Sequence, residues 1–453
     1  MSDWFFHPQR IEVDPGRVAE WKNSARHLDV SVKTANEDFR IKSDSEFDTK
    51  VSGASLSVIE HVAFSIETMG ADFPLDDLRE RPIEFASLLS ILIGHPLSIS
   101  SIRIVDGKGE HAYIYYPSFK HDVREEPRSW AEFLLKKPSL DGKWQEVIER
   151  FYKSAHRKLT WRRLAGLQRY EGFWEYRIVG YVSILDYYVN QRFSRRNAGF
   201  AVPTRPKLTG KDIRKVLRAL SSVTTEEVRE AIKEELKKIE REDSNLSVKF
   251  EHAIKDTDQD IAKIFDFSQE EFKEIRIARD QVAHGLEFTG EFQRLHNLVD
   301  KVSLLLTYWA FEDFGLTKED FVRGLTVFHA PIRQGAKLNE MEFARVAGTA
   351  RFLPVSRREF SRISALKGRA IGVCLDEQKN GNFRFSASRT KAYRNWLENT
   401  SKAPGLIAWN DVFHVKEGTV TSAGSAYLTC GKDSLNLHSV FLFAPSARMR
   451  RKP

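Results

Sequence analysis

The chain has 453 residues, of which 41% are hydrophobic and 30% are charged, and its formal net charge is +8. This length allows about two to four domains. No apolar run approaches the roughly 18–20 residues of a membrane span, and the first residues lack the pattern of a signal peptide. The two cysteines, Cys374 and Cys430, lie far apart in the sequence, so neither a disulfide framework nor a thiolate zinc site is expected. We therefore predict a cytoplasmic protein with no membrane partner.

The charge is unevenly distributed along the chain. Residues 150–220 contain 17 Lys and Arg against 4 Asp and Glu, and residues 331–453 contain 21 against 9, whereas residues 221–280 contain 11 against 17. Two basic regions thus flank a mildly acidic one. A field of this kind suits a polyanion such as nucleic acid, and solvated helix faces explain the same charges equally well.

Residues 1–140 are predicted to form a mixed, strand-rich domain. Residues 58–66 alternate imperfectly between apolar and polar side chains, which is typical of a partly buried strand. A helical stretch is expected to pause at Pro82, to resume after it and to end at Gly94. Two β-like runs within residues 97–116 flank an Asp-Gly-Lys-Gly turn signal and predict a hairpin.

Residues 141–325 are predicted to form an all-helical bundle. The apolar spacing indicates helices over 144–156, 164–193, 212–220, 224–241, 246–265 and 292–314. The second of these has a broad apolar surface that includes one acid, Asp186, which is either exposed or paired with a buried cation such as an arginine. That helix ends in Arg192, Arg195 and Arg196. Their role is either to compensate the helix dipole or to bind RNA phosphates. The basic residues that follow slightly favour the phosphate-binding interpretation.

Residues 326–453 are predicted to form a small α+β domain. Short β-like runs occupy residues 370–375, 382–387, 412–415, 426–429 and 439–443, and a helix is expected over 390–397. The last six residues form a basic arm. The predicted fold class is therefore α+β multidomain, with a strand-rich N-terminal domain, a central all-α bundle and this C-terminal domain.

The stretch Arg279-Asp280-Gln281-Val282-Ala283-His284 ends another predicted helix. Ser268 and Glu271 have the spacing of a capping box, and Gly285 can adopt the left-handed conformation that ends a helix. A surface salt bridge and an ordinary helix end would account for Arg279 and His284 without any function. No acid lies three or four positions from Arg279, however, so a partner for it would have to come from elsewhere in the fold.

An arginine, a polar residue and a histidine at a helix end within a bundle resemble the HEPN superfamily (higher eukaryotes and prokaryotes nucleotide-binding). A second stretch, residues 81–97 followed by the β-like residues 101–104, is similar to the N-terminal domain of the ApeA group of anti-phage HEPN proteins. Together the two resemblances cover about residues 50–320. The predicted C-terminal domain lies outside them.

The resemblance implies a metal-independent endoribonuclease of bacterial anti-phage defence that acts by abortive infection and needs no cofactor. Arg279, His284 and Asp280 would be catalytic, with Asp186 and Arg276 in support. A histidine changes charge near neutral pH and can move a proton, and an arginine binds phosphate oxygens. Asp280 would orient His284 or Arg279, or would pair with Arg276 on the helix surface.

The spacing of Arg279 and His284 bears on how a site could be built. Five positions amount to about 140° around an ideal helix, so the two side chains need not share a face, and the resemblance implies a site assembled between two copies in a homodimer. RNA, with tRNA as one candidate, and a phage-derived trigger are the implied partners, and the N-terminal domain would sense the trigger. Two other functions stay open: a non-catalytic HEPN scaffold for nucleic acid or a partner protein, and a DNA-binding regulator that uses the basic arm.

Overall fold

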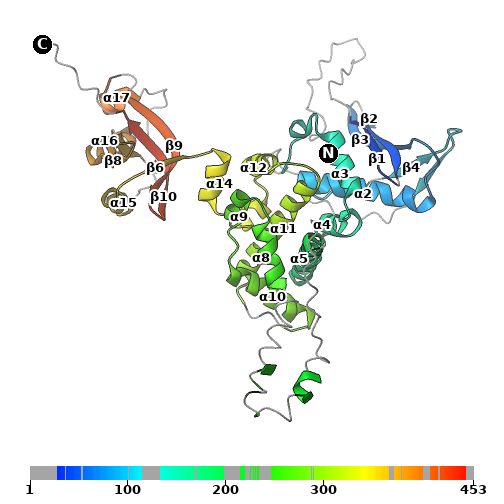
Figure 1. Ribbon diagram of the computed structural model, residues 1–453. Helices are drawn as coiled ribbons and strands as arrows, with labels where there is room; N and C mark the ends of the chain where they lie inside the picture. The colour runs from blue at the N-terminus through cyan, green and yellow to red at the C-terminus, as the bar shows by residue number, and fades with distance from the viewer. Residues whose placement is uncertain are drawn as a thin grey trace. The chain divides into compact units, whose positions relative to one another are not determined.

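The structure is a computed structural model of the 453-residue chain (Figure 1). It describes residues 28–35, 37–52, 55–99, 101–114, 133–168, 170, 172–197, 215–219, 225, 228, 230, 232–233, 246–286, 288, 290–366, 372–378, 380–400, 409–416 and 419–444. They belong to two compact units, 1–338 and 339–453, and each unit is described by itself. The predicted α+β multidomain fold class is confirmed.

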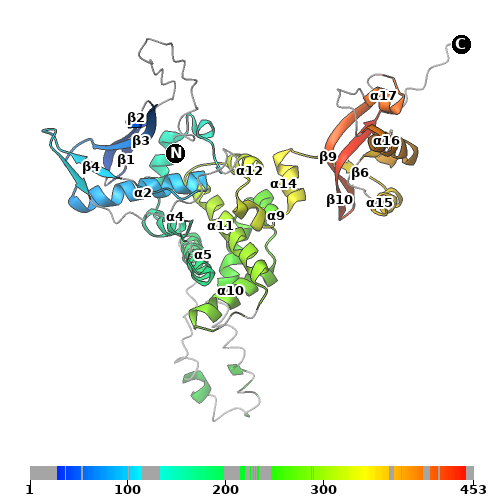
Figure 2. The same cartoon turned by 180° about the vertical axis from the view of Figure 1, so that it is seen from behind.

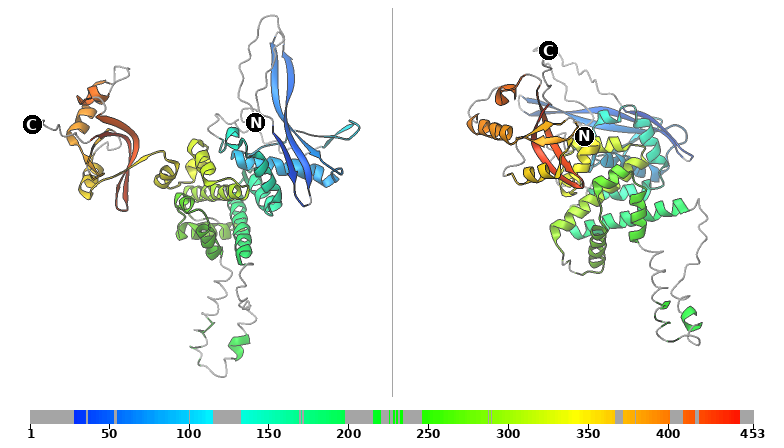
Figure 3. Two further views of the ribbon diagram at one scale, coloured as in Figure 1. Left: turned by 45° about the horizontal axis from the view of Figure 1, so that its top comes forward. Right: turned by 60° about the vertical axis from the view of Figure 1, so that its left-hand side comes forward.

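An antiparallel sheet forms the strand-rich part of the first unit, in the order β1-β2-β3 (Asp29–Lys33, Asp38–Ser52 and Ser55–Thr68). Strands β2 and β3 make a long hairpin in which Phe39 pairs with Thr68 (Figure 3). Alternate side chains of β1 and early β2 are buried: Val30, Val32, Phe39 and Ile41. The predicted strand over 58–66 is confirmed as part of β3.

Helix α2 (Leu75–Ile93) lies beside this sheet (Figure 2), and the ring centroids of Phe64 and Phe85 are 5.0 Å apart. The predicted pause at Pro82 is wrong, because α2 continues through this residue. A proline inside a helix costs about 3 kcal/mol. Residues 83–93 are all buried, and their burial offsets this cost. As predicted, α2 ends at Gly94, whose φ is +70°.

A two-stranded hairpin follows α2. Strands β4 (Ile102–Val105) and β5 (His111–Ile114) pair antiparallel. In the turn, the Asp106 carboxylate accepts hydrogen bonds from the N–H groups of Lys108 (2.9 Å) and Glu110 (2.8 Å). The predicted hairpin is therefore confirmed.

The described residues in the rest of the first unit are mainly helical. Its elements are η2 (Lys137–Leu140), α3 (Trp144–Lys153), the π turn η3 (Arg157–Trp161), α4 (Arg162–Gln168), α5 (Trp174–Asn197), α8 (Leu246–Lys255), α9 (Gln259–Phe265), α10 (Gln269–Ala283), α11 (Phe292–Asp313), α12 (Lys318–Val327) and α13 (Pro331–Gly335). Tyr188 of α5 stacks on Trp309 of α11, with the centroids 5.1 Å apart. The indole N–H of Trp309 donates to the Thr257 hydroxyl at 2.9 Å. These contacts join α5, α11 and the turn between α8 and α9 in one core.

Two of the predicted helices are divided in the structure. The helix predicted over 164–193 is α4 and α5, because the chain turns near Gly172, where an added Cβ would collide with the Tyr170 ring. The helix predicted over 246–265 is divided into α8 and α9. Asp258 caps the start of α9, because its carboxylate accepts hydrogen bonds from N–H groups of the first turn. The helices predicted over 212–220 and 224–241 lie outside the described residues, except for residues 215–219 and a few helical positions in 228–233.

The second unit is a mixed sheet with helices. Its elements are α14 (Glu340–Ala347), β6 (Arg351–Pro354), α15 (Arg357–Ser364), β7 (Val373–Glu377), β8 (Phe383–Phe385), α16 (Ala387–Thr400), α17 (Trp409–Phe413), β9 (Val420–Cys430) and β10 (Asp433–Phe443). The sheet order is β6-β9-β10-β7-β8. Successive residues of β7, Cys374 and Leu375, belong to different core clusters, so both faces of the sheet are covered.

One predicted strand of this unit is wrong. Residues 412–415 were expected to be β, whereas residues up to Phe413 belong to helix α17. The Phe413 ring packs on Phe441 of β10, with the centroids 5.2 Å apart. A short apolar run fits either a strand or a helix, and here packing on the sheet decides between them.

The basic arm lies outside the described residues. Nowhere in the described part of the chain does a helix have both the length and the apolar character that a membrane crossing requires.

Candidate active site and neighbouring charged groups

Helix α10 contains the stretch that the sequence singles out. Its capping box is formed as predicted: the Glu271 N–H donates to Ser268 Oγ (3.1 Å), and the Ser268 N–H donates to the Glu271 carboxylate (2.9 Å). Three apolar residues make its buried face: Phe272, Ile275 and Ala278. The polar residues of its last turns therefore stay at least partly exposed.

His284 is the residue that ends α10. Its backbone N–H still donates to the Asp280 carbonyl (3.1 Å), and Gly285 follows with a φ of +68°. The Leu286 N–H donates back to the Gln281 carbonyl (2.8 Å), which completes the helix end. The His284 side chain is exposed, so an external molecule can reach its imidazole.

Arg279 is held by two carboxylates. Its Nη1 lies 2.7 Å from Asp280 Oδ1, and its Nη2 lies 3.6 Å from Asp186 Oδ2 on α5. The Arg279 side chain is 30% exposed, so the guanidinium is oriented and still open to solvent. Of the two alternatives that the sequence left open for Asp186, exposure or pairing with a cation such as an arginine, the structure shows a pairing with Arg279 in which both side chains stay partly exposed. The catalytic roles of Arg279 and Asp280 and the supporting role of Asp186 stay predictions.

Asp186 is itself part of a polar row. The Asn190 side-chain amide donates to Asp186 Oδ1 (2.7 Å), and Lys249 Nζ of α8 donates to Asn190 Oδ1 (2.6 Å). Sequence reasoning missed Asn190 and Lys249. Asn190 lies four positions after Asp186 on one helix, a spacing that indicates neighbouring side chains, whereas no local signal connects Lys249 to this row.

The other predicted site residues are placed differently. Arg276 donates to the Ser247 hydroxyl at 3.3 Å, while Asp280 pairs with Arg279. Arg192 donates to the Asp256 carbonyl (3.2 Å) and lies 3.5 Å from a Glu312 carboxylate oxygen. These contacts attach Arg192 to the bundle, and its RNA-binding role stays a prediction. The side chains of Arg195 and Arg196 lie outside the described residues.

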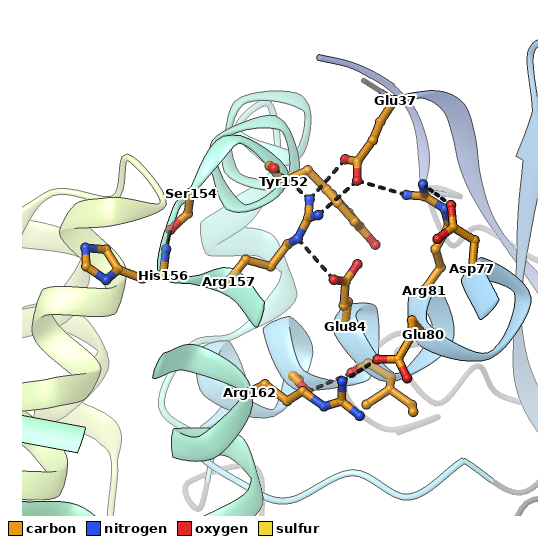
Figure 4. A network of polar contacts seen from close by, with 12 residues as sticks. Glu37, Asp77, Glu80, Arg81, Glu84, Tyr152, Ser154, His156, Arg157 and Arg162 are labelled. Carbon is orange, nitrogen blue, oxygen red and sulfur yellow. Dashed lines mark hydrogen bonds and ion pairs between the residues drawn. The ribbon is translucent and has the colours of Figure 1, made fainter. Parts of the chain in front are cut away.

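A buried network of charged groups links the sheet, α2 and η3 (Figure 4). Arg157 makes two hydrogen bonds to the Glu37 carboxylate (2.9 and 3.0 Å), and its Nε lies 3.1 Å from Glu84 Oε1. Arg81 lies 3.5 Å from Glu37 and 2.8 Å from Asp77. Burial raises the pKa of the Glu84 carboxyl. Sequence reasoning missed this network, because its members are too far apart in the chain to show a local pattern.

A second charged group lies between α5 and α11. Asp300 is 3.8 Å from Arg177 Nη2 and 3.8 Å from His296 Nε2. Burial raises the pKa of Asp300 to about 7 in spite of Arg177, and burial together with Arg177 lowers the pKa of His296. Near neutral pH both shifts favour neutral side chains. The Asp300–His296 contact is therefore a weak ion pair at most.

The raised pKa of Asp300 has a consequence for stability. Because the folded-state pKa of about 7 exceeds the ordinary value of 3.8, the folded state binds the proton more tightly, and stability is lost as the pH rises between these values. Asp300→Asn should remove this dependence. The unfolding free energy of Asp300→Asn minus that of wild type is the quantity of interest. We expect this difference to rise by about 2–3 kcal/mol from about pH 5 to about pH 8, because only wild type loses stability over this range.

Urea unfolding of both proteins across this pH range measures that difference. His296→Gln is the matched control, since a lowered histidine pKa costs stability as the pH falls below its ordinary value of 6.5. A difference between Asp300→Asn and wild type that does not change with pH would contradict the raised pKa of Asp300.

Within the described residues, no group of three or more His, Cys, Asp or Glu side chains could hold a metal ion.

The helices that carry Asp186, Arg279 and His284 belong to a recognised class of domain. Residues 179–320 match the family model described as Apea-like HEPN. Residues 1–151, which include the sheet and α2, match the model described as ApeA N-terminal domain 1.

The order of the two matched domains identifies the architecture. The chain belongs to the ApeA-like HEPN proteins, a family of nuclease-type defence proteins, and the resemblance drawn from its sequence is confirmed. No curated protein and no solved structure matches the chain significantly. Arg157 lies between the two matched stretches, so the buried network joins the N-terminal domain to the start of the helical region.

Proposed function

We propose that the chain is a metal-independent endoribonuclease of bacterial anti-phage defence that acts by abortive infection in the cytoplasm. One observation carries the proposal: Arg279 is oriented by Asp186 and Asp280, and His284 is exposed at the end of the same helix. The HEPN domain supports it, because proteins with this domain are generally nucleases and typically act as dimers on RNA.

The proposed reaction uses the 2′-OH of the RNA as its nucleophile. The hydroxyl oxygen attacks the adjacent phosphorus, the bond from phosphorus to the 5′-oxygen breaks, and a 2′,3′-cyclic phosphate and a 5′-OH result. His284 takes the proton from the 2′-OH or gives one to the 5′-oxygen. Arg279 stabilises the charge on the equatorial phosphate oxygens. Asp186 and Asp280 hold the guanidinium in place, which lowers the entropic cost of binding the phosphate.

A second copy of the chain is proposed to complete the site. His284 and Arg279 differ by five positions, about 140° around the helix axis, so one copy does not readily aim both side chains at one phosphate. Large apolar side chains of α10, of the residues after it and of the start of α11 are exposed: Ile277 (44%), Leu286 (61%) and Phe292 (50%). Such side chains favour an interface. In this arrangement a phage-derived trigger acts through the N-terminal domain, and Arg192, Arg195 and Arg196 contact the RNA.

The product ends test this chemistry. The purified full-length chain, incubated with tRNA and with mRNA, should yield 2′,3′-cyclic phosphate and 5′-OH ends. EDTA should leave the rate unchanged, because the proposed groups are all side chains. Products with 5′-phosphate ends, or loss of cleavage in EDTA, would contradict the mechanism. RNA binding without cleavage, even with extract of phage-infected cells, would favour the non-catalytic scaffold.

A further inference from the structure

A cavity of about 330 Å³ lies in the first unit and contains none of the proposed catalytic residues. Its walls come from residues 94–96 after α2, from Tyr170 and Gly172 between α4 and α5, from the first turns of α5, from the middle of α11 and from residues around the start of α13. It therefore borders both matched domains. Its volume is at the lower end of the range of roughly 300–1,000 Å³ that is typical of small-molecule sites.

The wall between α2 and the helical region is tightly packed. Leu134 donates its N–H to the Ile93 carbonyl at 2.7 Å. A Cβ added at Gly94 would lie 3.0 Å from Leu134 Cβ and 3.2 Å from the Phe328 ring. Because these neighbours leave little room for movement, the cavity has a defined wall and is more than a loose gap between helices.

The described residues of the lining combine aromatic rings with one arginine. Tyr170, Trp174 and Tyr181 contribute rings, and Arg177 contributes a guanidinium. The Trp174 ring makes edge contacts with Phe288 (5.6 Å) and Phe292 (5.1 Å), so its orientation is restricted. None of the described residues that line the cavity is acidic.

The Arg177 side chain is 26% exposed and is hydrogen-bonded to Tyr181, but one of its nitrogens is unsatisfied. Its Nε is buried and has no hydrogen-bond partner, and its carboxylate partner, Asp300, lies at the long distance of 3.8 Å. Because burial raises the pKa of Asp300 to about 7, this carboxylate neutralises Arg177 only in part near neutral pH. A buried donor without a partner is costly, and an anion in the cavity could supply the missing charge.

We infer that the cavity binds a small planar anion, namely an aromatic ring that carries one phosphate or carboxylate. The anionic group pairs with Arg177, and the ring packs against Tyr170 and Trp174. Because the cavity borders both the N-terminal domain and the HEPN domain, the bound molecule contacts both and stabilises their packed arrangement. This inference does not depend on whether the chain cleaves RNA.

Calorimetric titration of the full-length chain tests the inference with four probes: uridine 5′-monophosphate, anthranilate, uridine and inorganic phosphate. A ring that carries an anion should bind at least about 10-fold more tightly than uridine or phosphate alone. The first two probes distinguish a phosphate source from a carboxylate source. Arg177→Gln should weaken binding by about 10-fold or more, whereas Arg323→Gln, at an exposed position of α12 outside the cavity, should not.

Two further variants keep the test decisive. The Arg279→Ala/His284→Ala double variant should bind the probes as wild type does, because the proposed active site is not involved. If Arg177→Gln does not fold, Trp174→Leu should weaken binding of the ring-bearing probes and leave phosphate binding unchanged. Absence of binding at millimolar concentrations, equal affinity in Arg177→Gln and wild type, or loss of binding in the double variant would overturn the inference.

Discussion

Replacing Arg279 or His284 with alanine is expected to lower the RNA-cleavage rate by about 10³-fold or more, because each removes a group that acts on the reacting phosphate. The fold should be kept. His284 is exposed, and the ion pairs of Arg279 with Asp186 and Asp280 are partly solvated, so each substitution should cost about 1 kcal/mol of unfolding free energy or less. Single-turnover cleavage of labelled RNA and thermal unfolding measure the two effects.

The surroundings of Arg279 supply graded controls. Asp186→Asn keeps the shape of the side chain but removes the charge that orients Arg279, and we expect a loss of about 10- to 100-fold. Lys273→Ala, at an exposed position of the same helix, should cleave as wild type does. If Arg279→Ala retains wild-type activity while the protein stays folded, Arg279 has no catalytic role.

Mixing variants distinguishes a site within one copy from a site shared by two. In a mixed dimer of Arg279→Ala with His284→Ala, one intact Arg279 and one intact His284 are present, but on different chains. A shared site predicts that an equal mixture regains part of the activity that each variant lacks alone. If the mixture stays inactive although mixed dimers are shown to form, Arg279 and His284 act within one chain.

Arg157→Met should be the most destabilising single substitution in the buried network of Figure 4. It removes the cation that contacts the buried Glu84 carboxylate and one of the two cations that contact Glu37, and breaking a buried pair in this way costs about 3–5 kcal/mol. The Arg157 and Glu84 side chains are only 7% and 5% exposed. Guanidinium unfolding of the full-length chain, monitored by a probe in the first unit, measures the loss.

The same network contains a matched control. Arg162 pairs with Glu80, but these side chains are 40% and 29% exposed, so Arg162→Met should cost about 1 kcal/mol or less. Glu84→Gln should cost less than Arg157→Met, because it keeps the size of the side chain, leaves Glu37 paired with Arg157, and removes a carboxylate whose charged form burial disfavours. An Arg157→Met protein that is as stable as the Arg162→Met protein would show that the network contributes little to the fold.

Several parts of this structure follow from local sequence. The capping box at Ser268, the helix end at Gly285 and the turn at Asp106 all depend on hydrogen bonds between residues at most five positions apart. Such bonds are available wherever these residue types occur at this spacing, so the sequence predicts them correctly. The errors arose where packing decides. Residues 83–93 bury enough surface to keep α2 continuous through Pro82, and Phe413 packs on the sheet from a helix.

The candidate site shows the same division. The sequence by itself determined that Arg279 and His284 lie at the end of a helix, that no acid lies three or four positions from Arg279, and that Asp186 could pair with an arginine. Only the tertiary structure decided that Asp186 lies 3.6 Å from Arg279, that Arg157 is enclosed by Glu37 and Glu84, and that Arg177 lines a cavity. The reason is physical: these contacts join residues far apart in the chain, and their geometry is set by the packing of whole helices against one another.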